Sequence, residues 1–252
     1  MSAEDGKRIH FATDLDRTLF QRSPNIGSTP LGPFSRVLGV CDEPIVGARE
    51  ALHRLRDTGR YIHCAHITAR TVEMHGVTQA QLTEHGLDRY PDDQYVPLVS
   101  TDLDSWGKVR YLLDTGIQKD SGGNYLSDTD GFYIPSHPDQ AFVLIDDSFD
   151  VSEGGLDTLL RNPEYGRVAT DIAFVHFGAS SRSVPYIEGF IYMNLRGRFE
   201  VAAQKSSVHF TLTSELGDAT AQTNLHFLTL PEWSMAESMF QLLEKVMDEM
   251  KK

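Results

Sequence analysis

The 252-residue chain has few cysteines and no long apolar run. Its two cysteines, Cys41 and Cys64, are too few for a disulfide framework, so a reducing, cytoplasmic location is the simplest expectation. No stretch approaches the ~20 consecutive apolar residues of a membrane span. Residues 1–8 are polar and lack the apolar segment of a signal peptide. We therefore expect a protein that works without a membrane partner.

Positive charge is also scarce. The chain has 23 Lys and Arg against 36 Asp and Glu, which gives a formal net charge of -13. Binding to a nucleic-acid backbone or to an anionic membrane surface requires clustered Lys and Arg, so this balance argues against both as main partners. Internal repeats and low-complexity tracts are absent as well, and 40% of the residues are hydrophobic. These features indicate an ordinary globular protein with one substantial core.

The sequence does contain a regular alternation of short apolar segments and amphipathic segments. Strands are predicted at residues 9–13, 61–67, 95–100, 141–145 and 172–177, and helices at residues 44–58, 72–85, 103–114 and around 153–160. Strands that alternate with helices of this length indicate a parallel sheet covered on both faces. The predicted fold class is therefore α/β, a Rossmann-like doubly wound parallel sheet.

We expect two units along the chain. Residues 1–183 are predicted to form the parallel-sheet core, with an irregular, hairpin-like insert at residues 117–140. Residues 184–252 are predicted to form a C-terminal α+β extension, strand-like at residues 199–213 and helical at residues 234–250. One stripe of that helix is strongly apolar, so we expect the extension to pack on the core rather than to remain a free tail.

Acidic residues stand at the ends of two predicted strands. Asp14 and Asp16 follow the first strand, and Asp146 and Asp147 follow the strand at residues 141–145. Carboxylates are poor strand formers and are costly to bury, so their presence there needs a reason. In open α/β sheets, ligands bind at the carboxyl ends of the strands. We therefore expect the four carboxylates at one edge of the sheet, where hard oxygen ligands suit Mg²⁺.

Two other polar residues are predicted to reach the same edge. Thr68 ends the second strand, and Lys108 lies near the start of the third helix. Considered alone, Thr68 could equally be a strand-end cap, and a lysine such as Lys108 is more often a solvated helix residue. Together with the carboxylates they supply what phosphoryl transfer requires: a nucleophile, an acid–base group, metal ligands, and a hydroxyl and an ammonium around the transferring group.

With these residues in this order, the chain resembles the haloacid dehalogenase-like (HAD) superfamily of hydrolases, over roughly residues 8–178. The four motifs that carry the resemblance are Asp14-Leu15-Asp16-Arg17-Thr18, then Thr68, then Lys108, then Asp146-Asp147. The resemblance implies that Asp14 is the nucleophile and a Mg²⁺ ligand. It implies that Asp16 is the general acid and base and lends its backbone carbonyl to the metal.

The remaining roles are implied in the same way. Thr68 and Lys108 would bind phosphoryl oxygens, Asp146 would ligate the metal, and Asp147 would support it. An acid at position 16 separates phosphatases and mutases from dehalogenases within the superfamily. The function that the resemblance implies is a Mg²⁺-dependent phosphatase, which hydrolyses a phosphomonoester through an aspartyl-phosphate. A phosphorylated small molecule is the expected substrate, with a phosphoprotein as the alternative.

Other functions stay open at this point. A phosphomutase or phosphotransferase would use the same site, and a non-catalytic phosphate-binding protein could share the fold. Two-component receivers combine similar residues, but their acidic pair precedes the phosphoacceptor, whereas here it comes last. Arg70 is expected either to touch substrate or to form a surface salt bridge. Asp150 is either a metal-site residue or an ordinary loop acid.

The intervals in which such enzymes carry their substrate-specificity caps are short in this chain. Residues 21–42, rich in Gly, Pro and Ser, read as a loop or flap, and the step from Thr68 to Lys108 is too short for a large folded cap. We therefore expect a minimal-cap member of the family.

Overall fold

The computed structural model describes residues 8–22, 41–68, 70, 72–88, 94–97, 108, 117–129, 134, 136, 140–147, 171–178, 198–204, 207–216 and 219–249. Its strands are β1 (Arg8–Thr13), β2 (Phe20–Gln21), β3 (Glu43–Pro44), β4 (Tyr61–Thr68), β5 (Gln94–Pro97), β6 (Gln140–Asp146), β7 (Asp171–Phe177), β8 (Arg198–Gln204), β9 (Ser207–Leu216) and β10 (Ala219–Leu230). Its helices are α2 (Ala48–Asp57), α3 (His75–Glu84) and α7 (Ala236–Glu249), with 3₁₀ turns η1 (Val72–Met74) and η5 (Trp233–Met235).

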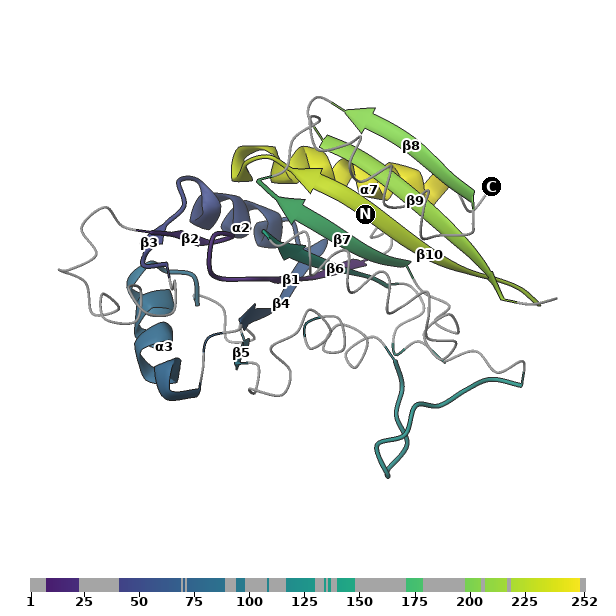
Figure 1. The fold of residues 1–252 in the computed structure, drawn as a ribbon, viewed down its shortest axis with the longest axis horizontal. Helices are drawn as coiled ribbons and strands as arrows, with labels where there is room; N and C mark the ends of the chain where they lie inside the picture. Colours follow the sequence, from purple (N-terminus) through teal and green to yellow (C-terminus); the bar gives the residue numbers. More distant parts are fainter. Residues whose placement is uncertain are drawn as a thin grey trace.

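Eight of these strands form one sheet, in the order β5-β4-β1-β6-β7-β10-β9-β8 (Figure 1). The strands from β5 to β10 in that order are parallel to their neighbours, whereas β9 and β8 run antiparallel. The chain turns to opposite sides of β1, first to β4 and β5 and later to β6 and β7. The carboxyl ends of β1, β4 and β6 therefore lie next to one another, at the place where α/β sheets bind ligands.

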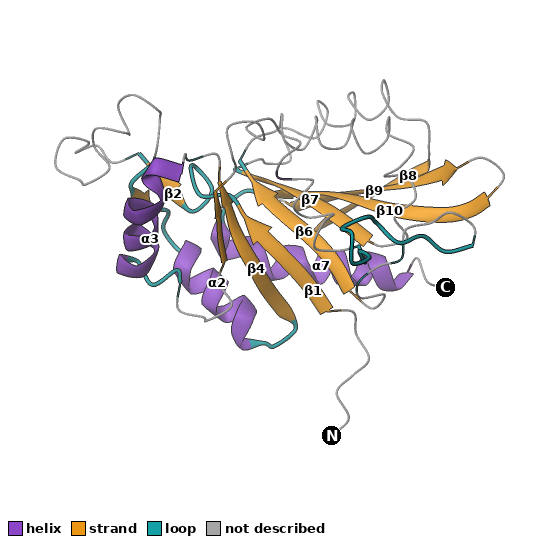
Figure 2. Cartoon of the chain, turned by 90° about the horizontal axis from the view of Figure 1, so that it is seen from below, coloured by secondary structure: helices purple, strands orange, loops and turns teal. Residues whose placement is uncertain are grey.

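The predicted α/β class with a mostly parallel central sheet is confirmed. Figure 2 shows α2 and α7 on the same face of the sheet. Covering of the second face by helices, and with it the doubly wound arrangement, stays a prediction. No helix in the described part of the chain combines the length and the apolar character needed to cross a membrane.

The predicted elements that fall on described residues appear with small shifts in their boundaries, whereas the helices predicted at residues 103–114, Lys108 excepted, and around 153–160 lie outside the described residues. The first helix starts at Ala48 rather than at residue 44, because Gly47 has a φ of 82°, a left-handed conformation that glycine accepts easily. The strand-like stretch at residues 199–213 belongs to two antiparallel strands, β8 and β9. Gln204 pairs with Ser207 across their connection, which contains neither Gly nor Pro, the residues that usually mark a turn.

The sheet continues across the division predicted near residue 183. Strand β10 lies parallel to β7, with Leu225 opposite Ile172, and it is followed in the sheet by β9 and β8. Residues 179–197 lie outside the described residues. The C-terminal segment thus supplies three strands of the central sheet, and the division into two units stays a prediction.

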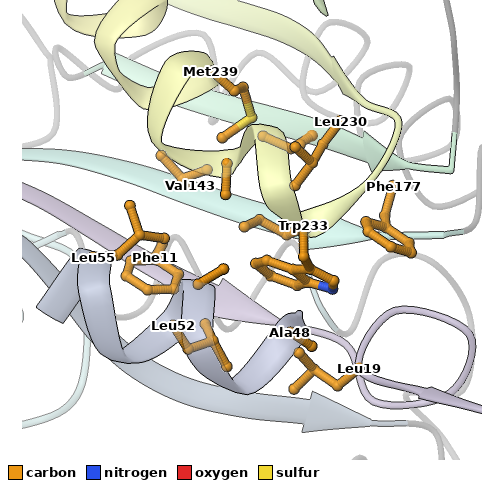
Figure 3. Packing of buried hydrophobic residues seen from close by; sticks show 14 of the residues in the cluster. Phe11, Leu19, Ala48, Leu52, Leu55, Val143, Phe177, Leu230, Trp233 and Met239 are labelled. Atoms are coloured by element: carbon orange, nitrogen blue, oxygen red, sulfur yellow. The ribbon is translucent and has the colours of Figure 1, made fainter. Parts of the chain in front are cut away.

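The main buried cluster lies between the sheet and helices α2 and α7. Figure 3 shows Phe11 of β1, Leu52 of α2 and Met239 of α7 converging around Trp233. All four side chains are essentially inaccessible to solvent. Helix α7 therefore forms part of the same core as β1, the strand that leads into the first acidic motif.

The insert at residues 117–140 contains antiparallel pairing where it is described. Lys119 and Tyr125 form an antiparallel bridge, and the backbone N–H of Ile134 donates to the carbonyl of Leu126 at 2.9 Å. The turn predicted around residues 130–131 lies outside the described residues. The hairpin-like character is thus seen at one end of the insert.

Candidate functional site

Asp14 and Asp146 leave two adjacent parallel strands at the same level. In the register of β1 and β6, Thr13 lies opposite Ile145, and the backbone N–H of Asp14 donates to the carbonyl of Ile145 at 2.8 Å. Both carboxylates are buried, with residue exposures of 4% for Asp14 and 2% for Asp146. The strand pairing itself therefore fixes the first two members of the predicted site side by side.

Lys108 lies between these two carboxylates. Its Nζ is 2.7 Å from Oδ1 of Asp14 and 2.5 Å from Oδ2 of Asp146. The ammonium is buried, and the residue is in helical conformation. Charge-assisted hydrogen bonds of this length are strong, and a buried ammonium requires them. The solvated helix lysine considered above is therefore excluded.

Asp147 adds a third carboxylate to this pair. One oxygen each from Asp14, Asp146 and Asp147 lie within 4.8 Å of one another, so this acidic triad could hold a metal ion. The Asp147 side chain is half-buried, and its Oδ2 lies 3.8 Å from Nη1 of Arg17. Three carboxylates beside one ammonium leave an excess of negative charge, and oxygen-only ligands of this kind suit a hard divalent cation.

The electrostatics of the triad follow from its burial. The pKa of Asp14 is raised to about 7: desolvation is the main cause, Lys108 opposes it, and the Asp146 and Asp16 charges add to it. Burial and the neighbouring Asp146 raise the pKa of Asp147 to about 6. Burial alone would lower the pKa of Lys108, but Asp14 and Asp146 outweigh it and raise that pKa. A bound divalent cation would favour the charged form of each carboxylate.

Thr68 ends β4, beside β1. Thr13 lies opposite His66, so Thr68 stands two residues beyond that pair, at the edge where Asp14 emerges. The threonine is buried, and its Oγ1 accepts a hydrogen bond from the backbone N–H of Arg70 at 3.1 Å. That bond is the strand-end cap considered above. Since a hydroxyl also has one hydrogen to donate, the cap leaves Thr68 able to bind a phosphoryl oxygen.

Asp16 lies in a different setting from Asp14. It is in the turn between β1 and β2, beside Arg17, whose φ of 65° is left-handed. Its Oδ1 accepts from Nη2 of Arg70 at 2.7 Å, and its Oδ2 accepts from Nε of Arg70 at 2.9 Å. The backbone N–H of Cys41 donates to Oδ1 at 2.6 Å. Asp16 is thus held by a bidentate ion pair, outside the acidic triad.

Among the candidate site residues, Arg70 is the one whose surroundings were predicted least well from the sequence. Its side chain is only 1% exposed, so the expected surface salt bridge is wrong. Two further residues of its surroundings, Thr78 and Gln81, were not singled out. Both are buried on α3, and their spacing of three residues puts two polar side chains on its inner face. That buried polar pair is the signal that could have identified them.

Five of the six predicted site residues lie at adjoining strand ends or contact them, and Asp16 lies in the turn that follows. Asp150 is outside the described residues. No protein-family model, curated protein or solved structure matches the chain. The chemistry of the site therefore rests on its geometry, which combines a buried lysine, a metal-competent acidic triad and a carboxylate held by an arginine.

Proposed function

We propose that the chain is a Mg²⁺-dependent phosphatase that hydrolyses a phosphomonoester through an aspartyl-phosphate. The observation that carries the proposal is the position of the Lys108 Nζ between Asp14 and Asp146, beside the third carboxylate of Asp147. A structural ion pair would need one carboxylate for one ammonium, and buried charges are retained only where they are compensated. The surplus carboxylates are what a divalent cation and a phosphoryl group require.

The residues divide the reaction as follows. The Asp14 carboxylate attacks phosphorus, so that a bond from its oxygen to phosphorus forms as the bond to the leaving oxygen breaks. Asp16 gives its proton to the leaving oxygen and later takes one from water. That water attacks the phosphorus of the aspartyl-phosphate, which releases inorganic phosphate and restores the Asp14 carboxylate. Asp16 ends protonated, as it began; the ion pair with Arg70 described above is that of its ionised form, which takes the proton from water.

The charge of the transferring group is balanced by the other residues. Asp14, Asp146 and Asp147 would hold Mg²⁺, with the backbone carbonyl of Asp16 as a further ligand. When bound, the ion neutralises charge on the phosphoryl oxygens. The Lys108 ammonium and the Thr68 hydroxyl bind phosphoryl oxygens. The net charge of -13 disfavours a nucleic acid, and we propose a phosphorylated small molecule as the substrate.

The proposal is tested by hydrolysis of 4-nitrophenyl phosphate with Mg²⁺ and with excess EDTA. We expect turnover only with Mg²⁺, and loss of turnover in Asp146→Asn. Binding is read independently: at a Mg²⁺ concentration 100 times its Kd, the wild type should gain about 2.7 kcal/mol in free energy of unfolding. Asp146→Asn should gain far less.

The matched control is Asp57→Asn, which neutralises an exposed aspartate at the end of α2. It should retain both turnover and stabilisation by Mg²⁺. Undiminished turnover in EDTA would contradict the metal assignment. If neither 4-nitrophenyl phosphate nor any of a panel of phosphorylated metabolites and phosphopeptides is hydrolysed with Mg²⁺ present, the phosphatase proposal is wrong.

A further inference from the structure

We propose that Arg70 is a positioning residue, which fixes the carboxyl group of Asp16 in the orientation needed for proton transfer. The inference rests on the proposed function and adds to it a residue that does not itself bind the phosphoryl group. It follows from the hydrogen bonds of one buried guanidinium.

The guanidinium of Arg70 makes five hydrogen bonds, all to groups of the protein. Nε and Nη2 hold the two oxygens of Asp16, at 2.9 and 2.7 Å. Nη2 also donates to the carbonyl of Cys41 at 2.7 Å. Nη1 donates to Oε1 of Gln81 at 2.7 Å and to Oγ1 of Thr78 at 3.3 Å.

An arginine side chain has five N–H groups, and these five bonds use all of them. The side chain is 1% exposed, and one face of it lies 5.6 Å from the ring centroid of Phe20. A substrate phosphate could bind Arg70 only by displacing one of these partners. Of the two roles expected from the sequence, direct contact with substrate is therefore disfavoured by the geometry, and Asp16 is the one charged partner among the five bonds.

Asp16 is held on one side and open on the other. Its Oδ1 accepts from Arg70 and from the backbone N–H of Cys41, whereas its Oδ2 accepts from Arg70. The Asp16 side chain is 26% exposed, in contrast to the buried arginine behind it. Its charge also raises the pKa of Asp14, two residues away along the chain.

The arginine is itself held by a rigid element. Thr78 and Gln81 anchor Nη1 from consecutive turns of α3, and Nε2 of Gln81 reaches the carbonyl of Cys41 at 3.4 Å. A bidentate guanidinium fixes both the position and the plane of a carboxylate, which a lysine cannot do. Because a shift of about 1 Å in a catalytic group can cost roughly 10²-fold in rate, loss of this orientation should appear in proton transfer.

The experiment compares kcat/KM for 4-nitrophenyl phosphate and phenyl phosphate, both with Mg²⁺. The two esters share a ring, but nitrophenolate leaves readily without a proton, whereas phenolate needs one from Asp16. We expect Arg70→Lys to lower kcat/KM for phenyl phosphate by roughly 10²-fold and to affect the nitrophenyl ester far less. Asp16→Asn should show the same selectivity, and the double variant should be no worse than Asp16→Asn alone.

A second variant covers the event that Arg70→Lys does not fold. Gln81→Met keeps the volume of the side chain but removes one anchor of the guanidinium, and it should show a smaller loss of the same selectivity. Arg49→Gln is the matched control, because among the described residues Arg49 pairs with exposed Glu50 on the surface of α2. It should leave both rates unchanged.

The outcomes separate this inference from the proposed function. If the wild type is active and Asp16→Asn is selective, but the Arg70 and Gln81 variants lower both rates equally or not at all, only the positioning role is overturned. Equal loss on both esters would show a purely structural arginine. If the wild type hydrolyses neither ester, the proposed function fails, and the inference that rests on it fails as well.

Discussion

Two cation-centred clusters form around Asp14, directly after β1, and around Asp16, in the turn that follows, and they differ in how their charges are balanced. The Lys108 cluster consists of Lys108, Asp14, Asp146 and Asp147, and the Arg70 cluster of Arg70, Asp16, Cys41, Thr78 and Gln81. The first has three carboxylates for one buried cation, and the exposed Arg17, 3.8 Å from Asp147, still leaves a carboxylate in excess. The second has one carboxylate for one cation, and neutral acceptors take up the remaining donors.

This difference explains which cluster can receive a ligand. An excess of buried negative charge is unfavourable until a cation joins it, so the Lys108 cluster is suited to binding a metal and a phosphoryl group. In the Arg70 cluster one carboxylate balances one cation, and every N–H group of the guanidinium is hydrogen-bonded. This cluster is therefore suited to holding a side chain in a fixed orientation. Asp14 and Asp16 are two residues apart in the chain and fall into opposite clusters.

The largest expected effects come from replacing each of these two aspartates in turn. Asp14→Asn removes the nucleophile, so turnover of 4-nitrophenyl phosphate should fall by at least about 10⁴-fold. Asp16→Asn should cost on the order of 10²–10⁴ in kcat, the usual contribution of general acid–base catalysis. It should also accumulate the aspartyl-phosphate, which intact-protein mass spectrometry would detect as one added phosphoryl group. Full activity in Asp14→Asn would contradict the proposed difference in role between the two clusters.

The carboxylates of the Lys108 cluster could be predicted from the sequence because each leaves a local signal, whereas Lys108 was singled out only together with them. Acidic residues directly after apolar strands are rare for structural reasons, and parallel strands bring their ends together. Arg70 was named, but its role was not identified. Asp16 is the one partner that charge and motif mark; the others are a backbone carbonyl and two neutral side chains, which carry no such signal. The pairing with Cys41 also joins positions 29 residues apart, which no local pattern indicates.

Prediction of the fold from the sequence has the same limit: long-range pairings leave no local pattern. Strands β1, β4, β6 and β7 are rich in apolar residues, and the sequence identifies them. Alternating apolar residues such as Val208, Phe210 and Leu212 also mark residues 199–213 as strand-like, but the connection between β8 and β9 carries no Gly or Pro, and β10 was not predicted. That β10 continues the sheet beside β7 is a long-range pairing, which depends on register rather than on local composition.

The contact between Trp233 and the turn after β1 supports both clusters, and a variant of Trp233 tests it. Its Nε1–H donates to the carbonyl of Thr18 at 2.7 Å, in the turn that carries both aspartates, and its ring packs on Phe177. Trp233→Phe leaves that buried carbonyl without its donor, so the free energy of unfolding should fall by roughly 1–3 kcal/mol. Urea unfolding measures this change.

The kinetics of Trp233→Phe should differ from those of the Arg70 variants. Since the turn supports both clusters, kcat/KM should fall by the same factor for phenyl and 4-nitrophenyl phosphate. Phe240→Leu is the control, because it shortens a buried side chain of the same core without removing a hydrogen bond. It should lower stability and leave kcat/KM unchanged. A Trp233→Phe variant with wild-type stability and kinetics would show that the C-terminal segment does not support the turn.

The last expected effect appears only in acid and is absent at neutral pH; it comes from His66 of β4, which is hydrogen-bonded to Thr13 of β1. Its Nε2 lies 3.1 Å from the carbonyl of Leu87 and must donate to it, so Nδ1 accepts from the Thr13 hydroxyl at 3.0 Å. This is the neutral ring, and burial lowers its pKa from 6.5 to about 4. Below pH 6.5 the unfolded chain binds a proton that the folded chain does not, so stability falls as the pH falls toward 4. Between pH 7 and pH 5 the loss in free energy of unfolding should be about 2 kcal/mol.

His66→Gln, which keeps a donor for the carbonyl of Leu87 but does not titrate, should show a shallower decline of stability in urea unfolding over that pH interval. Equal declines in both proteins would mean that His66 is not the residue that senses acid.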